Sequence, residues 1–462
     1  MIDADELADR HDRLYELHRG ELGHRRTSTV CVLADAAYLR THSGQVCWAT
    51  LLNLVARLYK GIERLRITID PGIERLPGVF FPNDLGDIRE ASFKMLEDLH
   101  GGPMAVEEGP AVADIEDGIV VCVGAPVATA PVTAITIAGR GWVAYLNDDA
   151  WISVADDQNA LGPMAAAALG TGQIYRRLYS NSGTKPERLV FSAFRNAEPA
   201  LNPPMPRRIH LPRTFVPGAG AVGMSFLAAL HCMAGIVSSD GLFIIDEDRI
   251  DASNLNRCLV AILADLVADD GGPLHKIDIL KARLAAKRLN LQTYPRMWEK
   301  FVEQPEFKNP HLYELVVSCV DKYDARKAVQ FAKQPRLLLT AGTGDFLLSV
   351  SRHRLDDGMS CGLCYQLRDR PPTCDTASEG AQHAFEKLID PSIGFVSALA
   401  GVLLAAEYVK EIHPEWHGDR VNNTARLYVL SGKFKAGRRT KDPACNCSSK
   451  YVILGYQDAW GG

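Results

Sequence analysis

The sequence predicts an α/β fold built on a largely parallel sheet. Short apolar segments that predict strands alternate with helical segments, as in residues 29–33, 46–59 and 65–69. The segment 315–320 is apolar without alternation, which is typical of a strand covered on both faces. A glycine-rich stretch at 216–223 lies between a short apolar segment and a predicted helix, where parallel α/β folds hold phosphate groups.

The length and composition indicate more than one globular domain. The chain has 462 residues, of which 47% are hydrophobic and 23% are charged, so it can bury a sizeable core in two or three domains. Its formal charge of -5 gives no reason to expect binding to nucleic acid or to an anionic membrane. The acidic start argues against a secretory signal, so we expect a cytoplasmic protein.

An uncharged run at 118–139 raises the question of a membrane span. Pro126 and Pro131 interrupt it, and its two apolar parts, 119–123 and 132–137, predict buried strands instead. We therefore expect a soluble protein. The odd number of cysteines, eleven, suits reduced thiols, metal ligands or a nucleophile better than a disulfide framework.

A proline-rich segment divides the chain. Five prolines stand at positions 199, 203, 204, 206 and 212, and such a run cannot continue a helix or sheet. We therefore predict a first α/β domain at 1–200, a linker at 201–212 and a second domain at 213–462. The first predicted strand-to-helix turn, 34–44, lacks the glycine spacing needed to bind phosphate. The first domain is thus expected to be an inactive version of a nucleotide-binding fold, although no fixed-period repeat is visible.

Within each half, the hydrophobic pattern places individual elements. Helices are expected at 3–18 and 163–179 in the first half, and at 221–234, 273–289 and 392–410 in the second. Further strands are expected at 242–245, 312–318, 336–340, 346–350, 426–430 and 451–454.

The glycine-rich stretch and the residues after it predict a nucleotide site. Gly218, Gly220 and Gly223 would bring backbone amides onto phosphate, and Asp246 ends the following strand, where a ribose-binding acid is expected. On the glycines alone, a tight turn without a ligand remains an alternative. Asp248 and the segment 253–257 then add polar and basic groups.

This combination resembles the adenylyltransferase superfamily of ubiquitin-activating enzymes and of the enzymes that activate sulfur carriers for thiamine and molybdopterin synthesis. The resemblance covers about residues 213–450 and implies a Rossmann-like adenylation domain that uses ATP and Mg²⁺. It assigns the phosphates and the metal to the residues Asp248, Asn254, Arg257, Lys276 and Asp321. Lys281 is the alternative to Lys276. For Arg257 or Lys276 taken singly, the alternative is an ordinary solvated surface charge.

The chemistry of adenylation explains these residue types. A peptide C-terminus has a pKa of about 3.5, so its carboxylate is already a nucleophile at neutral pH. The barrier is its repulsion from the triphosphate, which Arg257, Lys276 and a cation held by Asp321 would offset.

Two closely spaced cysteine pairs predict a zinc site. Cys361 with Cys364 and Cys445 with Cys447 supply four thiolates, enough to enclose one tetrahedral Zn²⁺. The resemblance places a structural zinc there, although the family usually has two intervening residues in both pairs. Free or redox-paired thiols are the alternative.

The resemblance also implies a catalytic thiol. Cys374 matches the position at which thioester-forming or persulfide-forming relatives carry their cysteine, and the alternative is an ordinary cysteine. In the family, an arginine from an N-terminal helix of a second protomer or half reaches the ATP. Arg10 and Arg13 are candidates for that role or are exposed helix charges.

Together these features predict an ATP-dependent activating enzyme for a small ubiquitin-like protein with a free C-terminal carboxylate. Thioester formation on Cys374 and transfer to a conjugating enzyme would follow. The two halves would form an internal version of the family's dimer, with a homodimer of the whole chain also open. The layout is similar to that of activating enzymes in bacterial antiphage operons. The alternatives are a sulfur-carrier or peptide adenylyltransferase without a thioester, a non-catalytic scaffold, and an NAD-dependent dehydrogenase.

Overall fold

The computed structural model describes most of the chain. The described residues are 28–59, 61–100, 104–109, 118–126, 130–131, 133–153, 158–179, 188–196, 202–267, 271–285, 289–364, 393–419 and 422–461. The helix predicted at 3–18, with Arg10 and Arg13, lies outside these residues, and so does Cys374.

Residues of the first half form a seven-stranded sheet in the order β3-β2-β1-β4-β5-β6-β7. Its strands are β1 (Ser28–Ala34), β2 (Ile62–Thr68), β3 (Ala105–Glu108), β4 (Ile119–Val123), β5 (Ile135–Arg140), β6 (Val143–Leu146) and β7 (Leu189–Ser192). Pairing is parallel from β3 to β5 and antiparallel for β6 and β7. The uncharged run at 118–139 thus supplies β4 and the start of β5, as predicted.

Residues of the second half form an eight-stranded sheet in the order β12-β11-β9-β13-β14-β15-β16-β17. Its strands are β9 (Thr214–Pro217), β11 (Leu242–Ile245), β12 (Leu291–Tyr294), β13 (Leu315–Ser318), β14 (Leu337–Gly344), β15 (Leu347–His353), β16 (Thr424–Tyr428) and β17 (Lys433–Gly437). The first five strands pair in parallel and the last three are antiparallel.

The two sheets share one topology. In each, the first strand in sequence is central, the second and third lie on one side, and the remaining strands follow in order on the other, up to the seventh in the first sheet and the eighth in the second. In each, the switch to antiparallel pairing comes after the fifth strand. The prediction of an α/β fold with a largely parallel sheet in both halves is therefore confirmed. The repeat lies in the order of the strands, which a search for a fixed sequence period does not detect.

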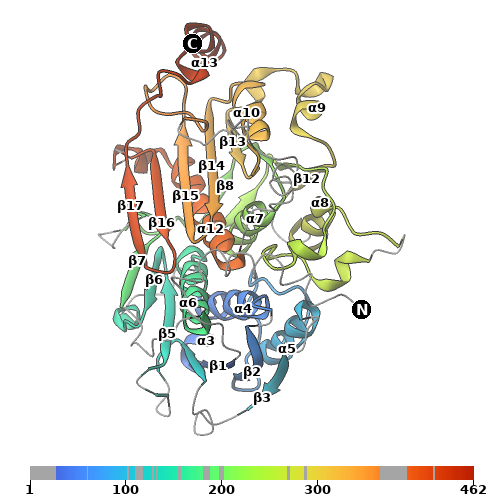
Figure 1. Cartoon of the computed structure of the whole chain (residues 1–462), viewed down its shortest axis with the longest axis vertical. Coiled ribbons are helices and arrows are strands. Elements are labelled where there is room, and N and C mark those ends of the chain that lie inside the picture. Colours follow the sequence, from blue (N-terminus) through green and yellow to red (C-terminus); the bar gives the residue numbers. More distant parts are fainter. Residues whose placement is uncertain are drawn as a thin grey trace, which may run out of the picture.

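Helices from both halves meet between the sheets (Figure 1). The helices longer than one or two turns are α4 (His42–Ala56), α5 (Ile88–Leu99), α6 (Leu161–Tyr179), α7 (Ala221–Cys232), α10 (Tyr323–Phe331), α12 (Gly394–Glu411) and α13 (Lys450–Trp460). Shorter ones are α3 (Ala36–Leu39), α8 (Lys276–Leu280) and α9 (Trp298–Val302).

The central helices α6 and α12 are buried on nearly all sides. Helix α6 packs on β5 and β6, α12 packs on β14 and β15, and the two helices pack on each other. Close approach requires small residues: a Cβ on Gly401 would lie 2.5 Å from the Cβ of Ser225 in α7. One hydrophobic core therefore spans both halves. Within the described ranges, none of the helices is long and apolar enough for a membrane crossing.

Two predictions about local structure were wrong. The segment 451–454 was expected to be a strand, but it belongs to α13, which is anchored by Tyr456 Oη donating to Arg336 O at 2.7 Å and Trp460 Nε1 donating to Gln334 O at 2.8 Å. The proline-rich linker was expected to lack regular structure. It contains β8 (Ile209–Leu211), a proline-free stretch that pairs with β10 (Ile236–Ser238).

Candidate nucleotide-binding site

The glycine-rich turn after β9 has the geometry of a phosphate cradle. Gly218 has φ +97°, and a Cβ there would lie 2.7 Å from the carbonyl carbon of Cys319. A Cβ on Gly223 would lie 2.2 Å from Gly218 O, so both positions require glycine. At Gly220, by contrast, nothing lies within 4 Å of the position that a Cβ would take, so this part of the turn is open.

The turn leads into the N-terminus of α7, which is a favourable position for an anion. Gly220 is the N-cap and offers no side-chain hydrogen bond, and the first turn of the helix has no acidic residue. The first amide N–H groups of a helix lack partners within the helix and carry the positive end of its dipole. The end of α7 is thus suited to bind phosphate.

Asp246 lies at the edge of this cradle. It follows β11, which pairs in parallel with β9, so the two strands end side by side. Its carboxylate accepts hydrogen bonds from Ala219 N at 2.5 Å and from Asp248 N at 2.8 Å. Burial raises the pKa of Asp246, and the bond from Ala219 and the nearby charge of Lys276 offset part of that effect.

Lys276 opens α8 and contacts Asp248. The ammonium Nζ lies 2.8 Å from Asp248 Oδ2, and the backbone N–H of Lys276 donates to Asp248 O at 3.0 Å. The lysine side chain is 10% exposed and that of Asp248 is 66% exposed. Burial alone would lower the pKa of Lys276, but the bond with Asp248 and the charge of Asp246 outweigh it and the pKa is raised. Lys281, the alternative from the sequence, is exposed.

Asn254 and Arg257 lie on a loop after β11. The 3-10 turn Ala252–Asn254 is capped by Asp251, whose side chain accepts from Asn254 N at 3.0 Å. Arg257 Nη1 donates to Ser253 O at 2.6 Å and to Asn256 Oδ1 at 3.1 Å, so the loop's own groups orient its guanidinium.

The charges of Arg257 and Lys276 both act on the buried thiol of Cys258. Burial raises the pKa of the Cys258 thiol, and both cations act in the opposite direction on it. The thiol of Cys258 is thus within electrostatic reach of the side chains of both Arg257 and Lys276.

Asp321 comes from the neighbouring strand. It lies just beyond β13, which pairs with β9, and Cys319 N donates to Pro217 O at 2.8 Å. The carboxylate is exposed and its Oδ1 accepts from Lys322 N at 2.8 Å. Asp321 therefore lies at the same end of the sheet as the cradle, and an exposed carboxylate is the kind of ligand that Mg²⁺ prefers.

The first half has a different structure at the equivalent position, after β1. The carboxylate of Asp35 accepts from Ala37 N at 3.0 Å and from Ala125 N at 3.1 Å. Tyr38 Oη donates to Gly139 O at 2.7 Å and fills the adjoining space. Amides that could hold a phosphate are therefore bonded to an acid of the chain itself.

The four predicted zinc ligands come together. Their sulfur atoms all lie within 4.8 Å of one another, with Cys361–Cys445 at 3.6 Å and Cys364–Cys447 at 3.5 Å. Four thiolates around one Zn²⁺, each at about 2.3 Å, lie roughly 3.8 Å apart, so the cluster fits that ion. Backbone N–H groups of Leu363 and Asp442 point at two of the sulfurs, at 3.3 and 3.4 Å, as expected for thiolates.

Sequence reasoning missed Arg57, a fully buried arginine at the end of α4. Its guanidinium donates to the carbonyl oxygens of Leu255, Leu259 and Ala261, on the loop that carries Arg257. The only local sign in the sequence is a basic residue inside the apolar segment 46–59.

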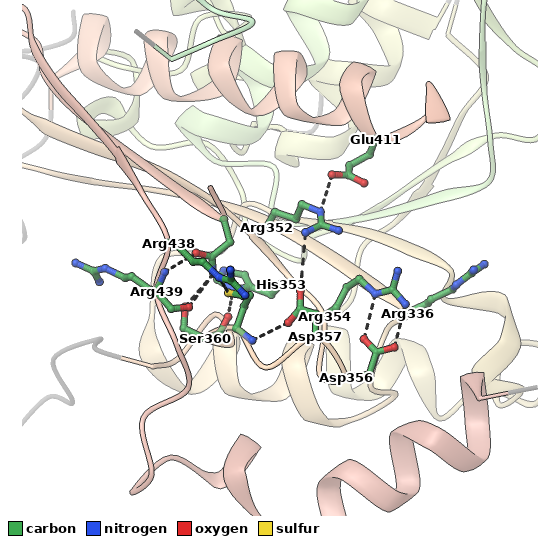
Figure 2. Close-up of polar contacts among 12 residues, drawn as sticks. Arg336, Arg352, His353, Arg354, Asp356, Asp357, Ser360, Glu411, Arg438 and Arg439 are labelled. Atoms are coloured by element: carbon green, nitrogen blue, oxygen red, sulfur yellow. Dashed lines mark hydrogen bonds and ion pairs between the residues drawn. The ribbon is translucent and has the colours of Figure 1, made fainter. Parts of the chain in front are cut away.

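A polar cavity of about 150 Å³ lies elsewhere, between the end of β7, strands β15 and β16 and the C-terminal end of α12. Arg352 Nε lies 2.8 Å from Glu411 Oε1 (Figure 2). Lys410 contacts Glu407, which also accepts from Asn196 Nδ2 at 2.6 Å. Both cations are paired with acids of the second half, and the hydrogen bonds from Asn196 Nδ2 to Glu407 and from Lys410 Nζ to Phe194 O, at 2.8 Å, join this cluster to the first half.

The chain is similar to several known proteins. The model of the ThiF family matches residues 196–449. The uncharacterised protein y4jF of Sinorhizobium fredii is 25% identical over 50% of this chain and 43% of its own length. The adenylyltransferase and sulfurtransferase UBA4 of Lodderomyces elongisporus is 28% identical over 44% of this chain and 41% of its own length. The chain thus matches about two fifths of the length of these relatives.

Solved structures of MccB from E. coli are also similar. One determined with ATP has a TM-score of 0.38 and 14% identity, covering 52% of this chain and 67% of that chain. Another structure of MccB has a TM-score of 0.39 and 14% identity, covering 51% of this chain and 64% of that chain.

Proposed function

Because the chain belongs to the ThiF family, we propose that it uses ATP to adenylate the C-terminal carboxylate of a small ubiquitin-like protein. The observation that carries the proposal is the cradle. The open N-terminus of α7, the Lys276–Asp248 pair and Asp321 all lie at the carboxyl ends of adjacent parallel strands. Nucleotides bind at that end of open α/β sheets.

In the proposed reaction, a carboxylate oxygen of the partner attacks the α-phosphorus of ATP and pyrophosphate leaves. Asp246 would bind the ribose, the amides of Gly220 and Gly223 would bind the phosphates, and Arg257 and Lys276 would neutralise the growing negative charge on the departing pyrophosphate. Gly218, whose own N–H donates to Ile245 O at 2.9 Å, would shape the turn that holds the phosphates. Asp248 and Asn254 would complete the polar shell. Mg²⁺ held by Asp321 would supply further charge neutralisation.

We propose that Cys374 then takes the acyl group as a thioester. Its thiolate attacks the acyl adenylate, the C–O bond to the phosphate breaks and AMP leaves. The position of α12 supports this step. A Cβ on Gly394, at the start of that helix, would lie 2.6 Å from Asn256 O. The start of α12, which follows Cys374 in the sequence, therefore lies against the loop that carries Asn254 and Arg257. A conjugating enzyme would accept the thioester.

In the proposed domain organisation, residues 1–200 form an inactive half, residues 201–212 a linker and residues 213–462 an active half. Asp35 and Tyr38 occupying the equivalent position of the first sheet support an internal pseudo-dimer with one nucleotide site. Zn²⁺ bound by Cys361, Cys364, Cys445 and Cys447 would have a structural role, since all four ligand positions are protein thiolates.

A second function, adenylation of a sulfur carrier or peptide without a thioester, is favoured by one observation. The relative UBA4 is named an adenylyltransferase and sulfurtransferase. In that case Cys374 would carry a persulfide or have no catalytic role.

Intact mass spectrometry tests the proposal. The protein is incubated with Mg-ATP and a ubiquitin-like partner, ideally one encoded beside it, and its mass is measured before and after reduction. We expect an adduct of the partner's mass that reductant removes, and that is absent from Cys374→Ala and Lys276→Met but present in Cys232→Ala. Pyrophosphate release without the adduct would support the second function. Neither signal with a validated partner would favour a non-catalytic scaffold.

A further inference from the structure

Arg57 links the first half of the chain to the loop at residues 252–261, which we call the nucleotide loop because it carries Asn254 and Arg257. Its guanidinium Nη2 donates to Leu259 O at 3.2 Å and to Ala261 O at 2.7 Å, and Nη1 donates to Leu255 O. One side chain thus binds three carbonyl groups that lie far along the chain, in the second half.

The helix that carries Arg57 holds it in place. Arg57 Nε donates to Asn53 Oδ1 at 2.8 Å, and Asn53 Nδ2 in turn donates to Leu259 O at 3.2 Å. Both residues are almost fully buried, at 1% and 2% exposure. The forked guanidinium suits this arrangement, because its five N–H donors have a fixed planar geometry and can satisfy several carbonyl groups at once.

The burial of this charge points to a role beyond packing. Burial lowers the pKa of Arg57, and none of the hydrogen bonds from the guanidinium goes to a carboxylate among the described residues. An apolar side chain would fill the space at a smaller desolvation cost. An apolar side chain, however, has no hydrogen-bond donors and so could not fix the position of the backbone carbonyl groups between Arg257 and Ile262.

Two other contacts hold the backbone of the nucleotide loop in place. Arg283, from the second half, donates to Val260 O at 2.9 Å and pairs with Asp265 at 2.6 Å. The start of α12 lies against Asn256 O, as described for Gly394. Arg57 and Asn53 therefore supply the side-chain hydrogen bonds that the first half makes to this loop, and Arg283 and the start of α12 contact it from the second half.

We infer that Arg57 is a positioning residue for the proposed adenylation reaction: through three backbone carbonyls of the nucleotide loop it holds Asn254 and Arg257 in the geometry that binds ATP. This inference rests on the proposed function. It gives the first half an indirect part in nucleotide binding, because Arg57 acts through the nucleotide loop and does not contact the nucleotide.

The test compares Arg57→Lys and Asn53→Ser with the matched control Arg66→Lys. Arg66 is also an arginine of the first half, but it pairs with Glu107 on the neighbouring strand, at 2.9 Å, away from the loop. Lysine keeps the charge and can reach fewer carbonyls, so we expect the KM for ATP in partner-dependent pyrophosphate exchange to rise about tenfold. The kcat at saturating ATP should change less, and Asn53→Ser should give a smaller effect in the same direction.

Hydrogen exchange of the amides at 254–261, measured without nucleotide, gives a readout that does not depend on activity. We expect faster exchange there in Arg57→Lys, unchanged exchange in α6, and no difference in Arg66→Lys. A folded Arg57→Lys protein with the wild-type KM and wild-type exchange at 254–261 would overturn the inference. A wild-type protein that shows no ATP-dependent reaction would instead overturn the proposed function, and the exchange result would then still decide whether Arg57 orders the loop.

Discussion

Lys276 Nζ lies 2.8 Å from Asp248 Oδ2, two residues beyond Asp246, whose carboxylate accepts a hydrogen bond from Ala219 N of the glycine-rich turn. The pair keeps a buried ammonium close to the place where phosphates would bind. In the proposed reaction, Asp248, which is mostly exposed, would exchange this contact for one with the metal or the nucleotide.

Replacing Lys276 by Met should weaken the proposed adenylation strongly. A hydrogen bond to a charged group is worth about 1.5–3 kcal/mol, which corresponds to a roughly 10- to 150-fold loss in kcat/KM for ATP. Pyrophosphate exchange measures this loss. Lys281→Met is the matched control, because Lys281 is close in sequence but exposed, and equal losses in both variants would contradict the assignment.

The charge on Lys276 should persist well above neutral pH. Because the pKa of Lys276 is raised in the folded protein, the stability from its ion pair is complete below the ordinary lysine pKa of about 10.4 and is lost only as the pH rises through the higher folded value. We therefore expect the ATP Kd to stay constant from about pH 7 to pH 9. A decline in affinity over this range that disappears in Lys276→Met would show that the lysine titrates there.

Alanine substitutions at Gly218 and Gly220 should have different effects on stability and on ATP affinity. Gly218→Ala puts a side chain at φ +97° against Cys319, so it should destabilise the fold by about 1–3 kcal/mol. Gly220→Ala meets nothing in the protein and should leave the melting temperature almost unchanged while its methyl group obstructs bound phosphate. Thermal melts and ATP titrations of the two variants separate these effects, and a Gly220→Ala protein with normal ATP affinity would place the phosphates elsewhere.

The chain should bind one nucleotide. In the first half, the carboxylate of Asp35 bonds amides at the turn after β1, so calorimetric titration with ATP should give a stoichiometry near one per chain. Asp35→Ala should leave this value unchanged. A second binding event in either protein would show that the first half retains a nucleotide site.

Elemental analysis should find close to one zinc per chain. Cys364→Ser should lose most of the metal and lower the melting temperature, because Cys361, Cys364 and Cys447 form a small core with Tyr456 of α13. Cys122→Ala, at a buried strand cysteine outside the cluster, should keep its zinc. Full metal content in Cys364→Ser would mean that the ion is bound elsewhere.

Local patterns predicted the glycine-rich turn, the acid after the next strand and the two cysteine pairs, and the family resemblance added Lys276. Glycines, an acid at a strand end and a lysine at a helix start are needed at fixed spacing, so the sequence displays them. The strand predicted at 451–454 was wrong because its apolar residues favour a strand, whereas contacts from Tyr456 and Trp460 to a distant part of the chain stabilise a helix.

The contacts of Arg57 could not be predicted, since its partners are backbone carbonyls that carry no mark in the sequence. The shared strand order of the two sheets is equally invisible, because it depends on how segments pair and not on which residues they contain.

The packing of α6 against α12 has a consequence for how the molecule behaves on dilution. Two separate subunits with this interface would dissociate as their concentration fell, but here the two surfaces belong to one polypeptide, so their encounter is intramolecular and independent of concentration. The contact between Arg57 and its loop is therefore present in every folded molecule, even when single molecules are far apart.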